Sequence, residues 1–341
     1  MPLTQLNFQP GIDTENTPTG AEGRWIDCDK VRFRKGLPQK IGGWTKFSEA
    51  YYVGVGRALE QWFALDGARY EALGTDRKIY VYQGGDNQDI TPIRSTEALV
   101  NAISTTSSSA IVTITDTAHG AIQGDFVTLS SVSAAVGGIP AATLDAEYEI
   151  LSIANVDAYT IQSSATASSA VGPTANCTVN YQLNIGPSEQ TFGYGWGAGN
   201  WNAGTWNTPR TSSQITLDAR LWSINNWGED LIITQKDGGT FEWETSAGMT
   251  DNRATVVANA PTTSTLSLVS TETRHVVCMG TETTIGTNTT QDKMFIRWSD
   301  QENYNQWTPN VTNSAGSQRI AGGSEIRCAR PAKGTILVWT D

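Results

Sequence analysis

The sequence Asp230-Leu-Ile-Ile-Thr-Gln-Lys-Asp-Gly-Gly-Thr-Phe-Glu-Trp243 contains two apolar segments separated by a polar turn. Asp230–Thr234 and Thr240–Trp243 are rich in β-branched and aromatic residues, which fit the pleated surface of a sheet. Between them, Asp237-Gly238 is typical of a tight hairpin turn, because glycine adopts positive φ without steric cost. This stretch therefore predicts a β-hairpin.

Three other hairpins of the same kind are predicted along the chain. The last three of the four recur at intervals of roughly 45–50 residues, the length of one four-stranded propeller blade. A blade cannot bury both of its faces alone, so successive blades must stack around an axis. The alternative is a series of unrelated hairpins, which any β-rich chain can contain. The other hairpins are Tyr70–Gly74 with Lys78–Tyr82, Arg274–Met279 with Lys293–Trp298, and Ile326–Arg330 with Thr335–Trp339.

The composition favours an all-β protein with many turns. The chain has 341 residues, of which 33 are glycine and 12 are tryptophan, and only 17% are charged. Residues that favour helices almost never recur at the helical period, and the best helical candidate is the short segment Glu97–Ile103. We predict an all-β fold with a β-propeller-like body and a small inserted β-barrel-like domain.

A segment of different composition separates the first predicted hairpin from the second. Residues 95–183 are rich in Ser, Thr and Ala and contain no tryptophan. An insertion into a loop costs little free energy when its ends lie close together. We therefore predict an N-terminal segment with the first blades at 1–94, an inserted domain at 95–183, and further blades, the last of them complete or incomplete, at 184–341. The predicted strands of the inserted domain are Ala110–Thr115, Asp125–Leu129, Glu147–Leu151 and Ala158–Gln162.

Charge and cysteine content exclude several classes of protein. The net charge of −11 disfavours a free-standing DNA-binding domain, which is usually basic. The four cysteines are scattered without paired spacing, so we expect neither a disulfide framework nor a zinc site, and we expect folding in a reducing cytoplasm. The N-terminal residues do not form a signal peptide, and no apolar segment is long enough to span a bilayer.

Motifs for catalysis and metal binding are not found in the sequence. Of the two histidines, His119 precedes a glycine in a turn and His275 begins an apolar strand, and neither has Asp, Glu or Cys neighbours at ligand spacing. No G-x-S-x-G elbow and no Walker-type loop is present. A glycosidase needs two facing carboxylates, and sequence alone places no such pair. We predict a protein without enzymatic activity, metal or cofactor.

Two groups of residues are candidates for assembly contacts. Arg32, Arg34 and Lys35 belong to a basic segment of an otherwise acidic protein, and such charges orient binding partners. The alternative is a solvated strand pair with alternating charge. The segment 192–206 alternates glycine and asparagine with large aromatics, which suits an extended loop that packs on a neighbouring surface; stacking on sugars is the alternative. The aromatic candidates are Trp44, Trp196, Trp201 and Trp206.

Short motifs in the chain resemble the tail tubular protein B, or tail nozzle, family of short-tailed bacteriophages, together with the related packaged-DNA-stabilising tail proteins. The resemblance covers the chain before the insert and after Asn184. The insert resembles a small barrel module of phage structural proteins, at the turns His119-Gly120 and Gly124-Asp125. The other matching motifs are Phe8–Asp13, Gly23–Trp25, Asp29–Gly36, Ile41–Trp44, Leu221-Trp222, Gly228–Asp230 and Gly238–Trp243.

The resemblance implies a virion tail protein that is made in the host cytoplasm. Members of the family form a hexameric ring below the head-to-tail adaptor, with a propeller in each subunit, double-stranded DNA passing along the axis, and contacts to tail fibres or spikes. The family implies no catalytic residues. Two alternatives remain open: a carbohydrate-binding adhesin or receptor-recognition protein of the virion, and a propeller glycosidase.

Overall fold

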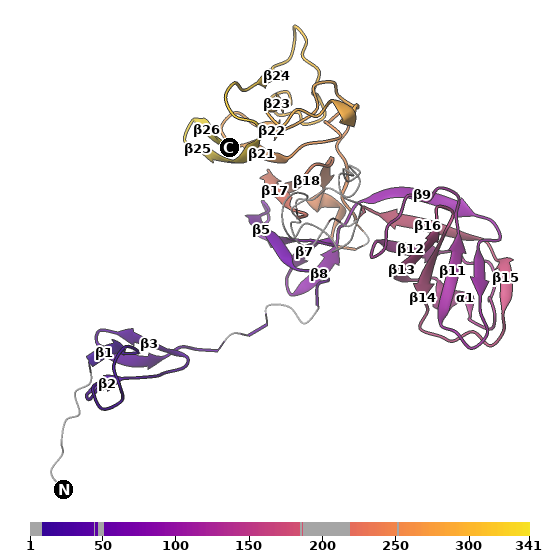
Figure 1. Cartoon of the computed structure of the whole chain (residues 1–341). Coiled ribbons are helices and arrows are strands. Elements are labelled where there is room, and N and C mark those ends of the chain that lie inside the picture. Colours follow the sequence, from indigo (N-terminus) through magenta and orange to yellow (C-terminus); the bar gives the residue numbers. More distant parts are fainter. Residues whose placement is uncertain (1–8, 44, 47–50, 185, 187–218, 251) are drawn as a thin grey trace, which may run out of the picture. The chain divides into compact units, whose positions relative to one another are not determined.

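The structure of the protein is a computed structural model (Figure 1) that describes residues 9–43, 45–46, 51–184, 186, 219–250 and 252–341. Its contacts divide the chain into two compact units, Met1–Glu49 and Ala50–Asp341. The helical elements described are short: α1 (Ala141–Leu144) and two 3-10 turns at Thr245–Ala247 and Asn288–Thr290. Among the described residues, no helix has the length and apolar character needed to cross a membrane.

The N-terminal unit consists of two small sheets. Strand β1 (Gln9–Ile12) pairs in parallel with β2 (Arg24–Trp25), and β3 (Val31–Arg34) forms an antiparallel hairpin with β4 (Leu37–Lys40). The two-residue turn of this hairpin places Lys35 and Gly36 at φ 52° and 78°. Positive φ at both positions is the geometry of a type I′ turn, whose twist matches that of the flanking strands.

The larger unit contains three antiparallel sheets of four strands, each a meander in chain order. The chain then forms a two-stranded hairpin. The first strands of consecutive sheets are neighbours, in the order β5, β17, β21 and β25. The strands are β5 (Gly56–Phe63), β6 (Arg69–Thr75), β7 (Ile79–Gln83) and β8 (Asp86–Asp89) in blade one; β17 (Trp222–Trp227), β18 (Asp230–Gln235), β19 (Thr240–Trp243) and β20 (Thr255–Val256) in blade two; β21 (Leu266–Ser270), β22 (His275–Met279), β23 (Phe295–Trp298) and β24 (Gly316–Arg319) in blade three; and β25 (Ile326–Ala332) and β26 (Thr335–Thr340) in the terminal hairpin.

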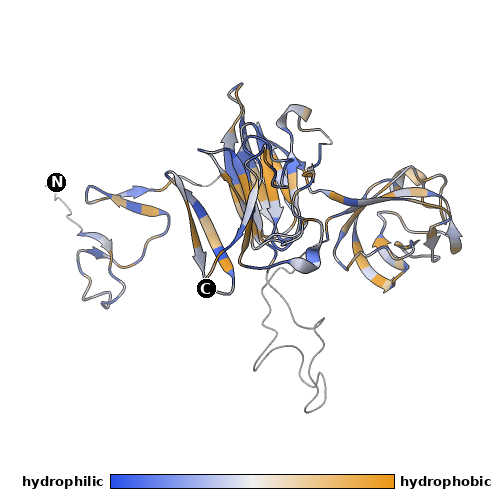
Figure 2. Ribbon diagram, turned by 90° about the horizontal axis from the view of Figure 1, so that it is seen from above, coloured by the Kyte–Doolittle hydropathy of each residue, from blue (hydrophilic) through white to orange (hydrophobic). Residues whose placement is uncertain are grey.

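Alternate residues of the blade strands pack against different neighbours. In β18, Leu231 and Ile233 join the core between blades one and two, whereas Ile232 joins the core between blades two and three. In β22, Cys278 faces blade two and Val277 faces the terminal hairpin. Side chains alternate between the two faces of a strand, so one short apolar run fills two cores. Figure 2 shows the hydrophobic residues gathered along these strands.

The segment between β8 and β17 forms an eight-stranded sheet in the order β15-β10-β11-β14-β13-β12-β16-β9. The two halves of the sheet enclose one apolar core that includes Ile114, Leu129, Ile150 and Val179. The strands are β9 (Ile93–Leu99), β10 (Ile103–Thr105), β11 (Ile111–Thr115), β12 (Phe126–Ser130), β13 (Glu147–Asn155), β14 (Ala158–Gln162), β15 (Val171–Thr174) and β16 (Cys177–Gln182). The predicted all-β fold with a propeller-like body is confirmed, and the insert is an eight-stranded sheet whose end strands, β15 and β9, do not pair with each other.

The helical candidate Glu97–Ile103 is wrong. Its first residues belong to β9 and its last residue begins β10, and the two strands lie on opposite halves of the sheet. Pairing of β9 with β16 along Ile93–Leu99 outweighs the weak helical preference of a short segment. That the predicted ranges 1–94, 95–183 and 184–341 act as independent domains stays a prediction.

Candidate functional site

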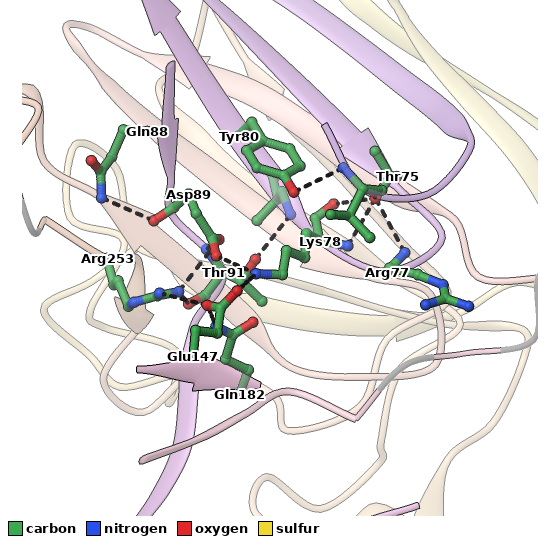
Figure 3. Close-up of polar contacts among 12 residues, drawn as sticks. Thr75, Arg77, Lys78, Tyr80, Gln88, Asp89, Thr91, Glu147, Gln182 and Arg253 are labelled. Atoms are coloured by element: carbon green, nitrogen blue, oxygen red, sulfur yellow. Dashed lines mark hydrogen bonds and ion pairs between the residues drawn. The ribbon is translucent and has the colours of Figure 1, made fainter. Parts of the chain in front are cut away.

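A buried ion cluster lies where the eight-stranded sheet meets the blades, and Figure 3 shows its charged side chains pointing toward one another. Lys78, just before β7, is only 3% exposed. Its Nζ donates to Asp89 Oδ2 of β8 at 2.8 Å and also to Glu147 Oε1 of β13. A lysine this deeply buried requires such partners, because an uncompensated buried charge is very costly.

Arg253 and Gln182 complete the cluster, which we call the junction cluster (Lys78, Asp89, Glu147, Gln182 and Arg253). The Arg253 guanidinium lies 3.3 Å from Asp89 Oδ1 and 3.5 Å from Glu147 Oε2, and it donates to the Thr91 carbonyl at 3.0 Å. Gln182 of β16 donates to Glu147 Oε2 at 2.5 Å. The cluster therefore links blade one, the segment after β19 and two strands of the insert.

Electrostatics support the ionised form of this cluster. Burial acts to raise the pKa of the Asp89 carboxyl, but Lys78 and Arg253 outweigh it, so the pKa lies below its ordinary value. Lys78 Nζ also lies 4.2 Å from the centre of the Phe126 ring of β12, a cation–π contact. A second ion pair, Arg77 with Glu149 at 2.8 Å, spans the same junction. Every charged group here has a partner within the protein, which indicates a structural connection.

A cavity of about 500 Å³ lies beside the first strands of the three blades and the terminal hairpin, and we call it the axial cavity. Four cationic residues line it: Arg57 of β5, Lys236 after β18, and Arg327 and Arg330 of β25. Glu60 of β5 is the acidic residue of the lining. The excess of cationic groups in a concave space suits the binding of an anionic ligand.

The residues predicted as assembly contacts fall into two sets. Arg32, Arg34 and Lys35 lie together on the β3–β4 hairpin and are exposed, and Arg32 Nε donates to Gln39 Oε1 at 3.1 Å. Their contribution to assembly stays a prediction. The aromatic candidates Trp44, Trp196, Trp201 and Trp206 lie outside the described residues.

Both histidine side chains contact neighbouring backbone groups. His119 is 7% exposed, and its Nδ1 accepts a hydrogen bond from the Ala121 amide at 3.0 Å. His275 Nδ1 lies 2.9 Å from the Ser299 carbonyl. Within the part of the chain that the structure describes, no group of three His, Cys, Asp or Glu side chains is arranged to hold a metal ion.

Sequence reasoning missed the residues of both sites. The residues that line the axial cavity are spread along the chain from Arg57 to Arg330. Those of the junction cluster are spread from Lys78 to Arg253. One signal was available at the junction: Lys78 directly precedes the apolar run Ile79–Tyr82, where a lysine is unusual unless it is paired.

Comparison with known proteins gives little guidance. No protein-family model matches the sequence, and no curated protein matches it significantly. Among solved structures, the chain is similar to the phage phi92 endosialidase with a TM-score of 0.24 and 11% sequence identity. The alignment covers 80% of this chain and 39% of that chain. A similarity this low establishes neither a shared fold nor a shared activity.

One prediction is corrected by this comparison. The matched protein is named as an enzyme, so the inference that the present chain lacks enzymatic activity is withdrawn. The similarity does not assign an activity to the chain either.

Proposed function

We propose that the protein is a component of a bacteriophage tail that recognises a receptor on the bacterial surface, in the manner of an adhesin. The observation that carries this proposal is the axial cavity, a concave space lined by four cationic side chains that come from β5, from β25 and from the turn after β18. Blades that pack face to face hold these strands rigidly, and a rigid scaffold loses little conformational entropy when it binds a ligand. The phage context comes from the sequence motifs that resemble tail proteins.

Binding to an array of bacterial surface polysaccharides tests this function. We expect saturable binding of the purified protein to at least one polysaccharide, with competition by the same polysaccharide in solution. A protein in which the cavity cations Arg57 and Arg330 are replaced by glutamine should lose this binding, whereas Lys333→Gln, an exposed residue of the β25–β26 turn, should retain it. If the protein binds no polysaccharide of a broad array, receptor recognition is contradicted.

A second candidate is a subunit of the tail nozzle, which docks on the head-to-tail adaptor, surrounds the DNA exit channel and anchors fibres or spikes. The exposed cations of the β3–β4 hairpin favour this candidate, because an acidic adaptor surface could pair with Arg32, Arg34 and Lys35. Negative-stain imaging of the protein mixed with purified adaptor tests it. Ring-shaped particles on the adaptor would support the nozzle, and a protein that stays monomeric beside the adaptor would refute it.

A further inference from the structure

The axial cavity has the size and boundaries of a small-molecule site. It is bounded by β5, β17, β21 and β25, which are the first strands of the three blades and of the terminal hairpin. Its volume of about 500 Å³ falls within the range of roughly 300–1,000 Å³ in which proteins hold small ligands. Four strands that are far apart in sequence therefore converge on one partly open pocket.

The charge of the lining is opposite to that of the protein. The chain as a whole carries a net charge of −11, yet the lining contains four cationic residues and one carboxylate. Arg327 also pairs with Glu325 at 3.0 Å, just beyond the lining. Glu325 and Glu60 offset part of this positive charge. A positive site in an acidic protein concentrates anions at that point of its surface.

We propose that the axial cavity binds a sugar-sized ligand that carries two or more anionic oxygen groups, either carboxylate or phosphate. The guanidinium groups of Arg57 and Arg330 bind the anionic oxygens, because guanidinium donors match the geometry of carboxylate and phosphate. This inference rests on the proposed receptor recognition and supplies the chemical class of the receptor group.

Titration calorimetry with pyrophosphate and with citrate tests the charge requirement and separates phosphate from carboxylate chemistry. We expect at least one of the two anions to bind, and maltose, which is uncharged, not to bind. Affinity should fall at least tenfold in the Arg57→Gln/Arg330→Gln double variant. Lys333→Gln removes one positive charge outside the lining and should bind as the unchanged protein does. Binding of neither anion, or equal loss in Lys333→Gln, would overturn the proposal.

Labelling of the unchanged protein gives a test that does not depend on the folding of a variant. Cys328 of β25 lines the cavity and is exposed, whereas Cys28 lies in the N-terminal unit. We expect saturating pyrophosphate or citrate to slow maleimide labelling of Cys328 at least fivefold and to leave that of Cys28 unchanged. Equal rates at Cys328 with and without both anions would refute the site.

The two proposals fail in different ways. Polysaccharide binding that is insensitive to the cavity variants and to both anions would retain receptor recognition but place it elsewhere on the protein. Binding of the small anions in the cavity without binding to any polysaccharide would retain the site but refute the adhesin function.

Discussion

The role of an individual residue in this protein depends on whether its side chain is buried or exposed. Lys78 precedes β7 and Arg330 belongs to β25, yet Lys78 is enclosed by carboxylates and Arg330 is exposed at a cavity. Burial also raises the pKa of the Cys278 thiol to about 11, which suppresses its thiolate form. The same residue type is thus structural at one position and available for binding or reaction at another.

Replacement of Lys78 by methionine should destabilise the protein by about 3 kcal/mol, because it leaves Asp89 and Glu147 without their shared buried cation. Urea denaturation followed by tryptophan fluorescence measures this change. Lys333→Met is the matched control, since Lys333 is exposed, and it should shift stability by less than about 0.5 kcal/mol. Equal stability of the two variants would show that the junction cluster is energetically neutral.

Acid should weaken the protein partly through Asp89. Its pKa is lowered in the folded state, so its contribution to stability is complete above the unfolded pKa of about 3.9 and is lost as the pH falls through the lower folded value. Unfolding free energies measured from pH 7 down to pH 2.5 should decline less steeply in Asp89→Asn than in the unchanged protein. Parallel pH profiles would contradict this assignment.

Cysteine reactivity should follow burial. Iodoacetamide should modify exposed Cys328 first, whereas Cys177 and Cys278, whose pKa values burial raises to about 11, should remain unmodified until urea unfolds the chain. Peptide mass spectrometry over a time course measures the order. Modification of Cys278 in the folded protein at the rate of Cys328 would show that the core between blades two and three opens readily.

At the scale of elements, the protein depends on close approach between neighbouring blades. The indole of Trp222, at the start of β17, donates to the Thr75 carbonyl of β6 at 2.6 Å. A Cβ atom added at Gly74 would lie 2.7 Å from Cδ1 of the same indole. Glycine is therefore required here by the contact between two blades, and its backbone angles do not demand it.

Gly74→Ala should destabilise the protein by about 1–3 kcal/mol, because the added methyl group displaces Trp222 and breaks the packing between blades one and two. Gly172→Ala in β15 is the control, since a Cβ there meets no atom within 4 Å. Thermal unfolding by circular dichroism compares the two. A melting temperature of Gly74→Ala equal to that of the control would mean that the blades tolerate a wider separation.

At the scale of the whole molecule, the chain enters and leaves the insert at two neighbouring points. Ile93 of β9 pairs with Gln182 of β16, and the Leu183 amide donates to the Pro92 carbonyl at 3.0 Å. Chain entry and exit are therefore adjacent, which is the geometry that makes insertion and removal of a domain inexpensive. The junction cluster then fixes the insert against blade one.

Replacing residues 94–181 by a short glycine linker should leave a body that unfolds cooperatively. Its stability should be lower than that of the full chain, because Lys78 keeps Asp89 but loses Glu147 and Phe126. Combining the deletion with Lys78→Met should cost less than the same substitution costs in the full chain. A deletion protein that lacks a cooperative transition would refute the insertion model.

The sequence by itself determined the class of the fold and the central hairpin of each blade. Alternation of apolar residues and Gly-containing turns are local properties, so the hairpins at 230–243 and 326–339 could be predicted from a few neighbouring residues. The strands β9, β10, β15 and β16 were missed, because their polar and small residues carry a weak strand signal and their pairing partners lie far along the chain.

Only the tertiary structure decided where charge accumulates. The junction cluster and the axial cavity each combine side chains from three or more separate strands or loops, and no local pattern reports such a distance. The physical reason is that strand pairing and blade packing set the positions of Lys78 near Glu147 and of Arg57 near Arg330, whereas sequence spacing constrains only residues within the same hairpin.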